Sequence, residues 1–227
     1  MKAVVLVGGF GKRLKPLTDE RPKPMIEILN VPIIEWQVKW LRKFGIKGFV
    51  LCVGYMREQI IDCIGNGSKY GAAVVYSVEE APLGTGGALK NAKSLLAGQD
   101  SFFMLIGDVL TDLDPNSLRV IDSQAIALVP LRSPYGVVEV GEDSRVTGFV
   151  EKPEIPGMWI NAGVYHLTQD VFNYLPENGN IEVTALPTLA SEGKLKAVKY
   201  RSGLWRSIDS HKGIEEATKE MQSLGMS

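Results

Sequence analysis

Cysteine and histidine are scarce in this sequence of 227 residues, which contains two of each. Cys52 lies in an apolar run and Cys63 in a helix-like stretch, and neither belongs to a CxxC pair or a Cys/His cluster. This spacing excludes a disulfide framework and a cysteine-based metal site. Both cysteines are expected to be small buried side chains, and a reducing cytoplasm is the expected location. His166 and His211 are expected to be structural or surface residues.

An excess of charge of one sign is also missing, because 25 basic and 26 acidic residues leave a net charge of −1. The chain therefore has no overall basic field of the kind that attracts nucleic acid or an anionic membrane surface. The longest apolar runs, at residues 102–106 and 126–130, have the length of a strand and are far too short to span a membrane. The first residues lack the pattern of a signal peptide. We expect a protein without nucleic-acid or membrane partners.

The remaining composition is typical of a folded α/β domain, with 45% hydrophobic and 22% charged residues. Strand-like runs at residues 3–7, 49–53, 73–76 and 102–106 alternate with helix-like stretches after Pro32, at 57–64 and at 89–96. This alternation predicts a Rossmann-like, doubly wound, mostly parallel sheet. The run at 102–106 is hydrophobic on both faces, so it is expected to be a central strand.

The second half has closer strands, at residues 137–140, 145–151 and 160–166, which predict a mixed or antiparallel extension of the sheet. A strand at 195–200 and a helix after Ser210, a suitable N-cap, complete the pattern. No linker or repeat marks a boundary, so we expect a single domain over residues 1–227.

The segment after the first strand carries the strongest functional signal. The strand at residues 3–7 runs directly into a turn with three glycines, Gly8, Gly9 and Gly11. Glycine lets a backbone bend tightly and approach a ligand closely. Arg13 and Lys23 follow this turn, and such cations are charge-assisted donors to phosphate oxygens. The segment therefore predicts a phosphate site.

Two common phosphate-binding motifs do not fit this turn. A dinucleotide fingerprint requires a third glycine where Leu14 stands, and a P-loop requires Ser or Thr where Arg13 follows Lys12. An ordinary glycine-rich turn explains neither the two cations nor the prolines around Lys23.

A third pattern does fit. The series Gly-Gly-x-Gly-x-Arg-Leu-x-Pro-Leu-Thr, followed shortly by Pro-Lys-Pro-Met, resembles the signature of the sugar-1-phosphate nucleotidyltransferases. The resemblance implies the transfer of a nucleoside monophosphate from an NTP to a sugar-1-phosphate. Lys12 departs from the family, which often has Thr or Ser there, and its role is open. Many members add a β-helix of hexapeptide repeats. Nothing repeats here after residue 209, so we expect the catalytic core alone.

The resemblance extends to residues 82–88, Pro-Leu-Gly-Thr-Gly-Gly-Ala, which are similar to the segment that approaches the nucleotide base. Taken alone, these residues are a loop before a helix. The nucleotide-binding residues that the resemblance implies are Leu6, Gly8, Gly9, Gly11, Lys12, Arg13, Lys23, Pro82, Gly84, Thr85 and Gly107.

A metal site for Mg²⁺ is also implied. Asp108 follows the expected central strand, at the sheet edge where open α/β folds bind ligands, and it resembles the family's metal aspartate. Residues 205–209 resemble the segment Trp-x-Asp-Ile-Gly-Thr imperfectly, with Ser207 at the usual aspartate and Asp209 at a glycine. We predict that Asp108 and Asp209 hold the metal. The alternative for each aspartate is that it caps a helix, and Asp209 would do so together with Ser210.

Sugar-phosphate contacts are implied by Glu-Lys-Pro at residues 151–153 and by Asn-x-Gly at 161–163. Without the family, Glu-Lys-Pro is an exposed strand end. The residues expected to bind the sugar phosphate are Gly136, Glu151, Lys152, Asn161 and Gly163.

The implied reaction is an in-line attack of a sugar-phosphate oxygen on the α-phosphorus of the NTP, with pyrophosphate leaving. The nucleophile is already ionised at neutral pH, so catalysis consists of positioning and charge neutralisation. Arg13 would neutralise the pyrophosphate, Lys23 the α-phosphate region and Lys152 the attacking phosphate. With Asp108, these are the expected catalytic residues.

Three interpretations of the function remain open. GTP with mannose-1-phosphate leads, because residues 83–85 and 133–139 resemble guanylyltransferase stretches. UTP or dTTP with glucose-1-phosphate or a related sugar phosphate is the alternative. A non-catalytic homologue that binds a sugar nucleotide and regulates a partner is the third, favoured by the imperfect segment at 205–209. The oligomeric state is not legible in the sequence.

Overall fold

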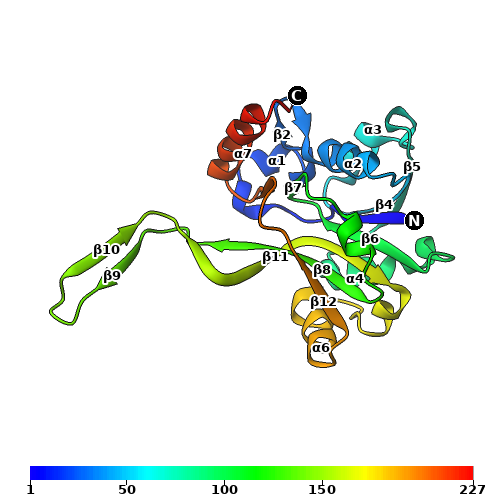
Figure 1. Cartoon of the computed structure of the whole chain (residues 1–227). Coiled ribbons are helices and arrows are strands. Elements are labelled where there is room, and N and C mark those ends of the chain that lie inside the picture. Colours follow the sequence, from blue (N-terminus) through cyan, green and yellow to red (C-terminus); the bar gives the residue numbers. More distant parts are fainter. Residues whose placement is uncertain (227) are drawn as a thin grey trace.

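Seven strands form the central sheet of the computed structural model, which describes residues 1–226 (Figure 1). Their order across the sheet is β12-β8-β11-β6-β1-β4-β5. Their bounds are β1 Lys2–Leu6, β4 Gly48–Val53, β5 Ala73–Val78, β6 Ser101–Ile106, β8 Gln124–Arg132, β11 Glu154–Thr168 and β12 Leu195–Lys199. The paired strands are parallel except that β11 is antiparallel to both β6 and β8. The predicted doubly wound, mostly parallel sheet is confirmed, with β6 at its centre.

Helices cover both faces of the sheet. Successive strand residues point to opposite faces, so Val5 packs with α2 (Ile33–Lys43) and α3 (Arg57–Ile64). Val4 packs with α4 (Gly84–Asn91) and α6 (Ala185–Ser191) on the other face. A third cluster joins α7 (His211–Ser223) to the N-terminal segment through Met221, Leu14 and Ile26. Among residues 1–226, no helix is both long and apolar enough to cross a membrane.

The remaining elements are short. The other helices are α1 Leu17–Glu20 and α5 Asn116–Arg119, and the 3-10 turns are η1 Lys12–Leu14, η2 Lys23–Met25, η3 Ser68–Tyr70, η4 Lys93–Leu96, η5 Gln169–Asn173 and η6 Ile181–Val183. The other strands are β2 Glu27–Ile28, β3 Val31–Pro32, β7 Val109–Thr111, β9 Val137–Val140, β10 Val146–Val150 and β13 Trp205–Ser207.

The pairing of β1 with β6 positions the functional segments. The two strands are parallel and Leu6 is in register with Ile106. The glycine turn that follows Leu6 and the Gly107–Asp108 step that follows Ile106 therefore leave the sheet side by side, at its carboxyl edge.

The strands β9 and β10 differ from the expectation. In the described chain they pair only with each other and form an arm that projects from the body (Figure 1). The arm leaves apolar side chains in solvent, and Phe149 is 64% exposed. Of the three segments expected to extend the sheet, only β11 does so. The reason is that β11 lies between β6 and β8, while the other side of β8 is taken by β12.

The helix predicted at residues 89–96 is also displaced. The α-helix begins at Gly84 and ends at Asn91, and a 3-10 turn follows. The early start is stabilised by a distant segment, because the amides of Gly86 and Gly87 donate to the carbonyl of Gly179. The last helix begins as predicted, with the Ser210 hydroxyl accepting from the Gly213 amide at 3.1 Å.

Candidate active site

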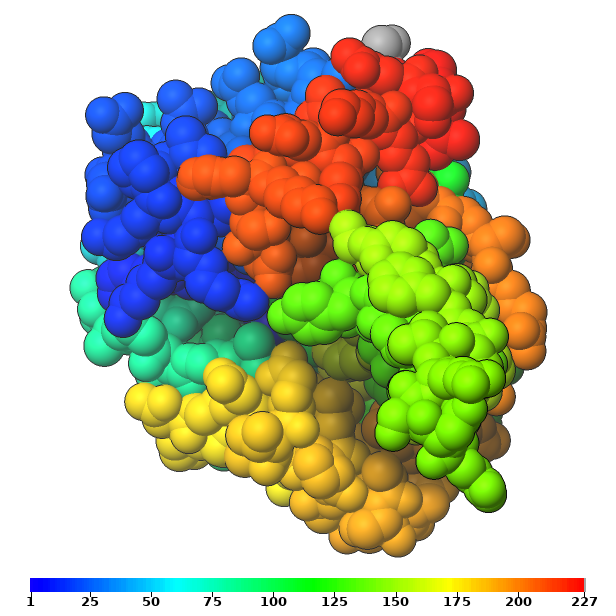
Figure 2. All heavy atoms as spheres, turned by 90° about the vertical axis from the view of Figure 1, so that its left-hand side faces the viewer, coloured from blue at the N-terminus to red at the C-terminus, as the bar shows by residue number. Residues whose placement is uncertain are grey.

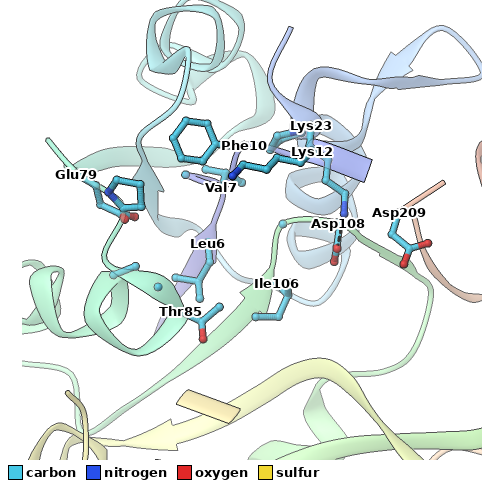
Figure 3. A pocket seen from close by; sticks show the side chains of 18 of the residues that line it. Leu6, Val7, Phe10, Lys12, Lys23, Glu79, Thr85, Ile106, Asp108 and Asp209 are labelled. Carbon is cyan, nitrogen blue, oxygen red and sulfur yellow. Dashed lines mark hydrogen bonds and ion pairs between the residues drawn. The ribbon is translucent and has the colours of Figure 1, made fainter. Parts of the chain in front are cut away.

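A pocket of about 400 Å³ lies at the carboxyl ends of β1 and β6. Figure 2 shows the face of the molecule that carries it, hollowed between the N-terminal segment in blue and the arm in green. Its wall includes every residue expected to bind the nucleotide: Leu6, Gly8, Gly9, Gly11, Lys12, Arg13, Lys23, Pro82, Gly84, Thr85 and Gly107. Asp108 and Asp209 line the same pocket (Figure 3). Segments from the beginning and the end of the chain thus line one pocket.

Two glycines allow the backbone to take this shape. The Gly107 amide donates to the Leu6 carbonyl at 2.9 Å, and a Cβ on Gly107 would lie 2.3 Å from that carbonyl oxygen. Gly11 has φ +62°, in the left-handed region, where it begins the 3-10 turn that carries Lys12 and Arg13. Both positions therefore require glycine for local reasons.

Lys23 and Asp108 form the inner ion pair of the pocket. The Lys23 Nζ lies 2.6 Å from Asp108 Oδ2, and the two side chains are only 15% and 20% exposed. Partial burial strengthens a hydrogen-bonded ion pair, and removing one partner would leave an uncompensated charge. The cation expected to meet the α-phosphate is thus held against the carboxylate expected to meet the metal.

Arg13 and Asp209 form the outer ion pair. Arg13 Nη1 lies 2.9 Å from Asp209 Oδ2, with side chains 78% and 38% exposed. An exposed pair of this kind contributes little stability, so Arg13 can change partners at low cost. The N-cap of α7 is Ser210 and not Asp209.

The donor set for a metal can be judged from these two carboxylates. The Ile208 amide donates to the Asp108 carbonyl at 2.9 Å, which brings Asp209 next to the Gly107–Asp108 step. Within residues 1–226 there is no group of three or more His, Cys, Asp or Glu side chains that could hold a metal ion by itself. Two hard carboxylates in one pocket do suit Mg²⁺, which is usually bound by one or two carboxylates together with substrate phosphates.

Two polar residues of the pocket wall were not foreseen from the sequence. Glu79 follows β5 directly, lies half-buried on the pocket wall, and accepts from the Leu83 amide at 3.1 Å. Burial raises the pKa of its carboxyl. Asn180 accepts from the Thr85 amide at 3.3 Å and also lines the pocket. A polar residue at the end of a parallel strand was a usable signal for Glu79, whereas Asn180 arrives through a tertiary contact that leaves no local pattern.

The five residues expected to bind the sugar phosphate lie outside this pocket wall. Gly163 is nearest to it, because a Cβ there would lie 3.0 Å from Val109 and 3.2 Å from Ile106, on either side of the Gly107–Asp108 step. The amide of Asn161 is engaged internally, donating to the Tyr165 hydroxyl at 2.6 Å and accepting from the Gly163 amide at 3.0 Å.

The other three residues lie around the base of the arm. A Cβ on Gly136 would lie 3.0 Å from Glu151 Oε2, so these two are neighbours. Lys152 has φ 47°, an uncommon value outside glycine. Hydrogen bonding and charge repulsion from Lys212 lower the pKa of Lys152. The charges of Glu151 and Glu216 act on this pKa in the opposite direction, so the two lysines lie beside two carboxylates.

Residues 2–223 match the profile of a protein family described as nucleotidyl transferase. The chain belongs to the nucleotidyl transferase family. The resemblance noted in the N-terminal signature is therefore confirmed over almost the whole chain.

Curated relatives of this nucleotidyl transferase are longer than the chain. The bifunctional protein GlmU of Methanococcus maripaludis is 36% identical over 219 residues, which are 92% of this chain and 51% of that protein. A mannose-1-phosphate guanyltransferase of Aspergillus oryzae is 36% identical over 231 residues, which are 96% of this chain and 63% of that protein. The chain thus spans between half and two thirds of these relatives.

Solved structures match the transferase over its full length. HddC from Yersinia pseudotuberculosis is 28% identical with a TM-score of 0.76, covering 97% of this chain and 99% of that one. A second structure of HddC, complexed with GMP-PN, is 27% identical with a TM-score of 0.75. The match covers the arm-bearing second half of the chain as well as its N-terminal half.

Proposed function

We propose that this chain transfers a nucleoside monophosphate from an NTP to a sugar-1-phosphate and releases pyrophosphate. The observation that carries the proposal is the pocket in which the glycine turn, Arg13, Lys23 and Asp108 meet. One pocket thus offers backbone donors, two cations and a carboxylate to a triphosphate and its metal. The substrates would be the two small molecules, and the cytoplasm the location, since Cys52 and Cys63 are both unpaired.

The mechanism follows from charge. A sugar-phosphate oxygen forms a bond to the α-phosphorus while the bond from that phosphorus to the pyrophosphate oxygen breaks on the opposite side. No proton has to move, because the attacking oxygen is already ionised. Two polyanions must approach each other, and positioned cations lower the cost of that approach.

Each cation has its place in this account. Arg13, in its exposed pair, would release Asp209 and neutralise the departing pyrophosphate. Lys23, held at 2.6 Å from Asp108, would meet the α-phosphate. Lys152, beside Lys212, would meet the attacking phosphate, with Glu151 and Asn161 on the sugar. Lys12 lines the pocket and would add a third cation over the triphosphate.

Asp108 and Asp209 would hold Mg²⁺, which supplies charge neutralisation at the phosphates when it is bound. Both carboxylates are balanced by lysine or arginine in the structure. The two cations would thus keep the carboxylates satisfied until metal and nucleotide enter together.

Glu79 favours a guanine nucleotide. An ionised carboxylate only accepts hydrogen bonds, and the Watson–Crick edge of guanine presents two adjacent donors, N1–H and the 2-amino group. Uracil and thymine present one donor between two carbonyls, which a carboxylate would repel. The curated guanyltransferase and the HddC complex with GMP-PN point the same way. We therefore propose GTP with mannose-1-phosphate, and UTP or dTTP with glucose-1-phosphate as the alternative.

The test is pyrophosphate release by the purified chain with ATP, GTP, UTP or dTTP and either mannose-1-phosphate or glucose-1-phosphate. We expect GTP with mannose-1-phosphate to be fastest. A preference for UTP or dTTP would select the alternative substrates. Binding of a sugar nucleotide without pyrophosphate release in any combination would replace the catalytic proposal by a regulatory homologue.

A further inference from the structure

Helix α2 carries four side chains that donate to main-chain carbonyls elsewhere in the chain, and one of them, Arg42 near its end, bonds the carbonyls of Tyr70 and Ile46. Trp36 Nε1 donates to the Ile28 carbonyl at 2.9 Å, and Trp40 Nε1 donates to the Leu113 carbonyl at 3.0 Å. Between them on the helix, Gln37 is 2% exposed and donates through Nε2 to two carbonyls. The helix is therefore bonded to the N-terminal segment at Ile28 and to the chain at and after the end of β6, at Ile106, Val109 and Leu113.

The two carbonyls that accept from Gln37 lie at the two ends of the short turn that contains Gly107 and Asp108. They belong to Ile106, at 3.1 Å, and to Val109, at 2.8 Å. The two residues between them are Gly107 and Asp108. One side-chain amide thus closes the turn that presents the Asp108 carboxylate to Lys23.

The other end of the Gln37 amide shows that this arrangement has a cost. Its Oε1 is buried without a hydrogen-bond partner in the described part of the chain. A buried acceptor that lacks a partner is destabilising, and native proteins contain few of them. An apolar side chain at this position would avoid that cost and lose both donors, so the two donors are what the amide contributes.

We propose that Gln37 is a positioning residue for Asp108. By bonding the carbonyls before and after the Gly107–Asp108 step, it keeps the carboxylate at the place where it meets Lys23 and would meet the metal. The part that concerns the metal rests on the proposed function, and the part that concerns the turn does not.

The experiment compares Gln37→Met with Trp40→Phe. Met keeps the length of the side chain and removes both donors, while Phe removes one donor from the same helix and leaves the turn untouched. A second variant, Gln37→Asn, keeps both donors on a shorter side chain. Amide hydrogen exchange is measured on the ligand-free protein at Ile208, whose amide donates to the Asp108 carbonyl.

We expect faster exchange at Ile208 in Gln37→Met, a smaller increase in Gln37→Asn and no local increase in Trp40→Phe, even where melting temperatures fall alike. Unchanged exchange in Gln37→Met, or an equal increase in Trp40→Phe, would overturn the proposal.

The second readout is Mn²⁺ binding, followed by water-proton relaxation with nucleotide present and no sugar phosphate. Gln37→Met should weaken binding about tenfold, as loss of support behind a metal ligand does, and Trp40→Phe should not. Faster amide exchange at Ile208 with unchanged Mn²⁺ binding would contradict the proposal that Gln37 positions the Asp108 carboxylate. A wild-type protein that binds no Mn²⁺ would contradict the proposed metal role, while the exchange contrast would still decide whether Gln37 holds the turn.

Discussion

Lys23 and Asp108, which lie 85 residues apart in the chain, meet at 2.6 Å in the pocket. Each is held by a different element, Lys23 by the turn after the glycine segment and Asp108 by the end of the central strand. If, as proposed, a nucleotide and a divalent cation enter this pocket together, the positive and the negative group can exchange partners. This pair is the centre of the functional account.

The first prediction concerns Lys23. Lys23→Ala should lower kcat/KM about 100-fold or more, because a preorganised charge at the reacting phosphate is lost. Lys15→Ala is the matched control, since Lys15 belongs to the same segment and forms only an exposed pair with Asp19. Steady-state pyrophosphate release measures both, and near-normal turnover of Lys23→Ala would refute the assignment.

The second prediction separates a metal role of Asp209 from the capping role of its neighbour Ser210. Asp209→Asn should raise the Mg²⁺ concentration for half-maximal rate several-fold and leave the melting temperature almost unchanged. Ser210→Ala should leave the Mg²⁺ requirement unchanged and lower the melting temperature, because a lost helix cap costs about 1 kcal/mol of stability. A magnesium titration with thermal melts decides between them. An unchanged requirement in Asp209→Asn would remove that residue from the metal site.

The third prediction concerns the choice of base. Glu79→Gln should lower kcat/KM for GTP about tenfold or more, because the carboxylate interaction with two donors is lost, and should affect UTP far less. Glu80→Gln is the control, since Glu80 is 84% exposed at its side chain and pairs with Arg57 on the surface. An equal loss for GTP and UTP would show that Glu79 shapes the pocket without reading the base.

The fourth prediction concerns stability and pH. His166 is 4% exposed, neither ring nitrogen has a partner in the described residues, and burial, followed by Arg119, lowers its pKa. Below the ordinary pKa of about 6.5 the unfolded chain therefore binds more protons than the folded one, so the unfolding free energy falls as pH falls.

The slope from this group is at most about 1.4 kcal/mol per pH unit. Urea unfolding between pH 7 and pH 5 should show a smaller loss in His166→Phe than in the wild type. His211→Gln, at an exposed histidine, should keep the wild-type dependence. Parallel curves for wild type and His166→Phe would contradict the assignment.

The sequence predicted the parts that depend on local chemistry. The glycine turn, Arg13 and Lys23 lie within one short segment, and the Gly107–Asp108 step follows an apolar strand. Their position at one sheet edge followed from the predicted parallel sheet, because the carboxyl ends of parallel strands lie at the same edge. Residues brought in by tertiary contacts were missed. Asn180 reaches the pocket through Thr85, and Gln37 acts through two carbonyls of a distant turn.

The arm and the start of α4 show the same limit. The strand character of residues 137–140 was correctly predicted, but the pairing partner of a strand is set by the tertiary arrangement, and here β9 pairs with β10. The helix at Gly84 begins early because of Gly179, nearly a hundred residues later. The helix propensity of residues 84–88 does not reveal that contact, so the early start of the helix could not be predicted from the local sequence.

The most direct test of the account is product formation by wild type and Asp108→Asn, followed by phosphorus NMR with GTP, mannose-1-phosphate and Mg²⁺. The account predicts a nucleotide sugar and pyrophosphate from the wild type. It predicts neither product from Asp108→Asn, a variant that should remain folded although its melting temperature falls, because Lys23 loses its charged partner. If a folded Asp108→Asn variant formed product at the wild-type rate, this result would contradict the central claim that transfer takes place where Lys23 and Asp108 meet.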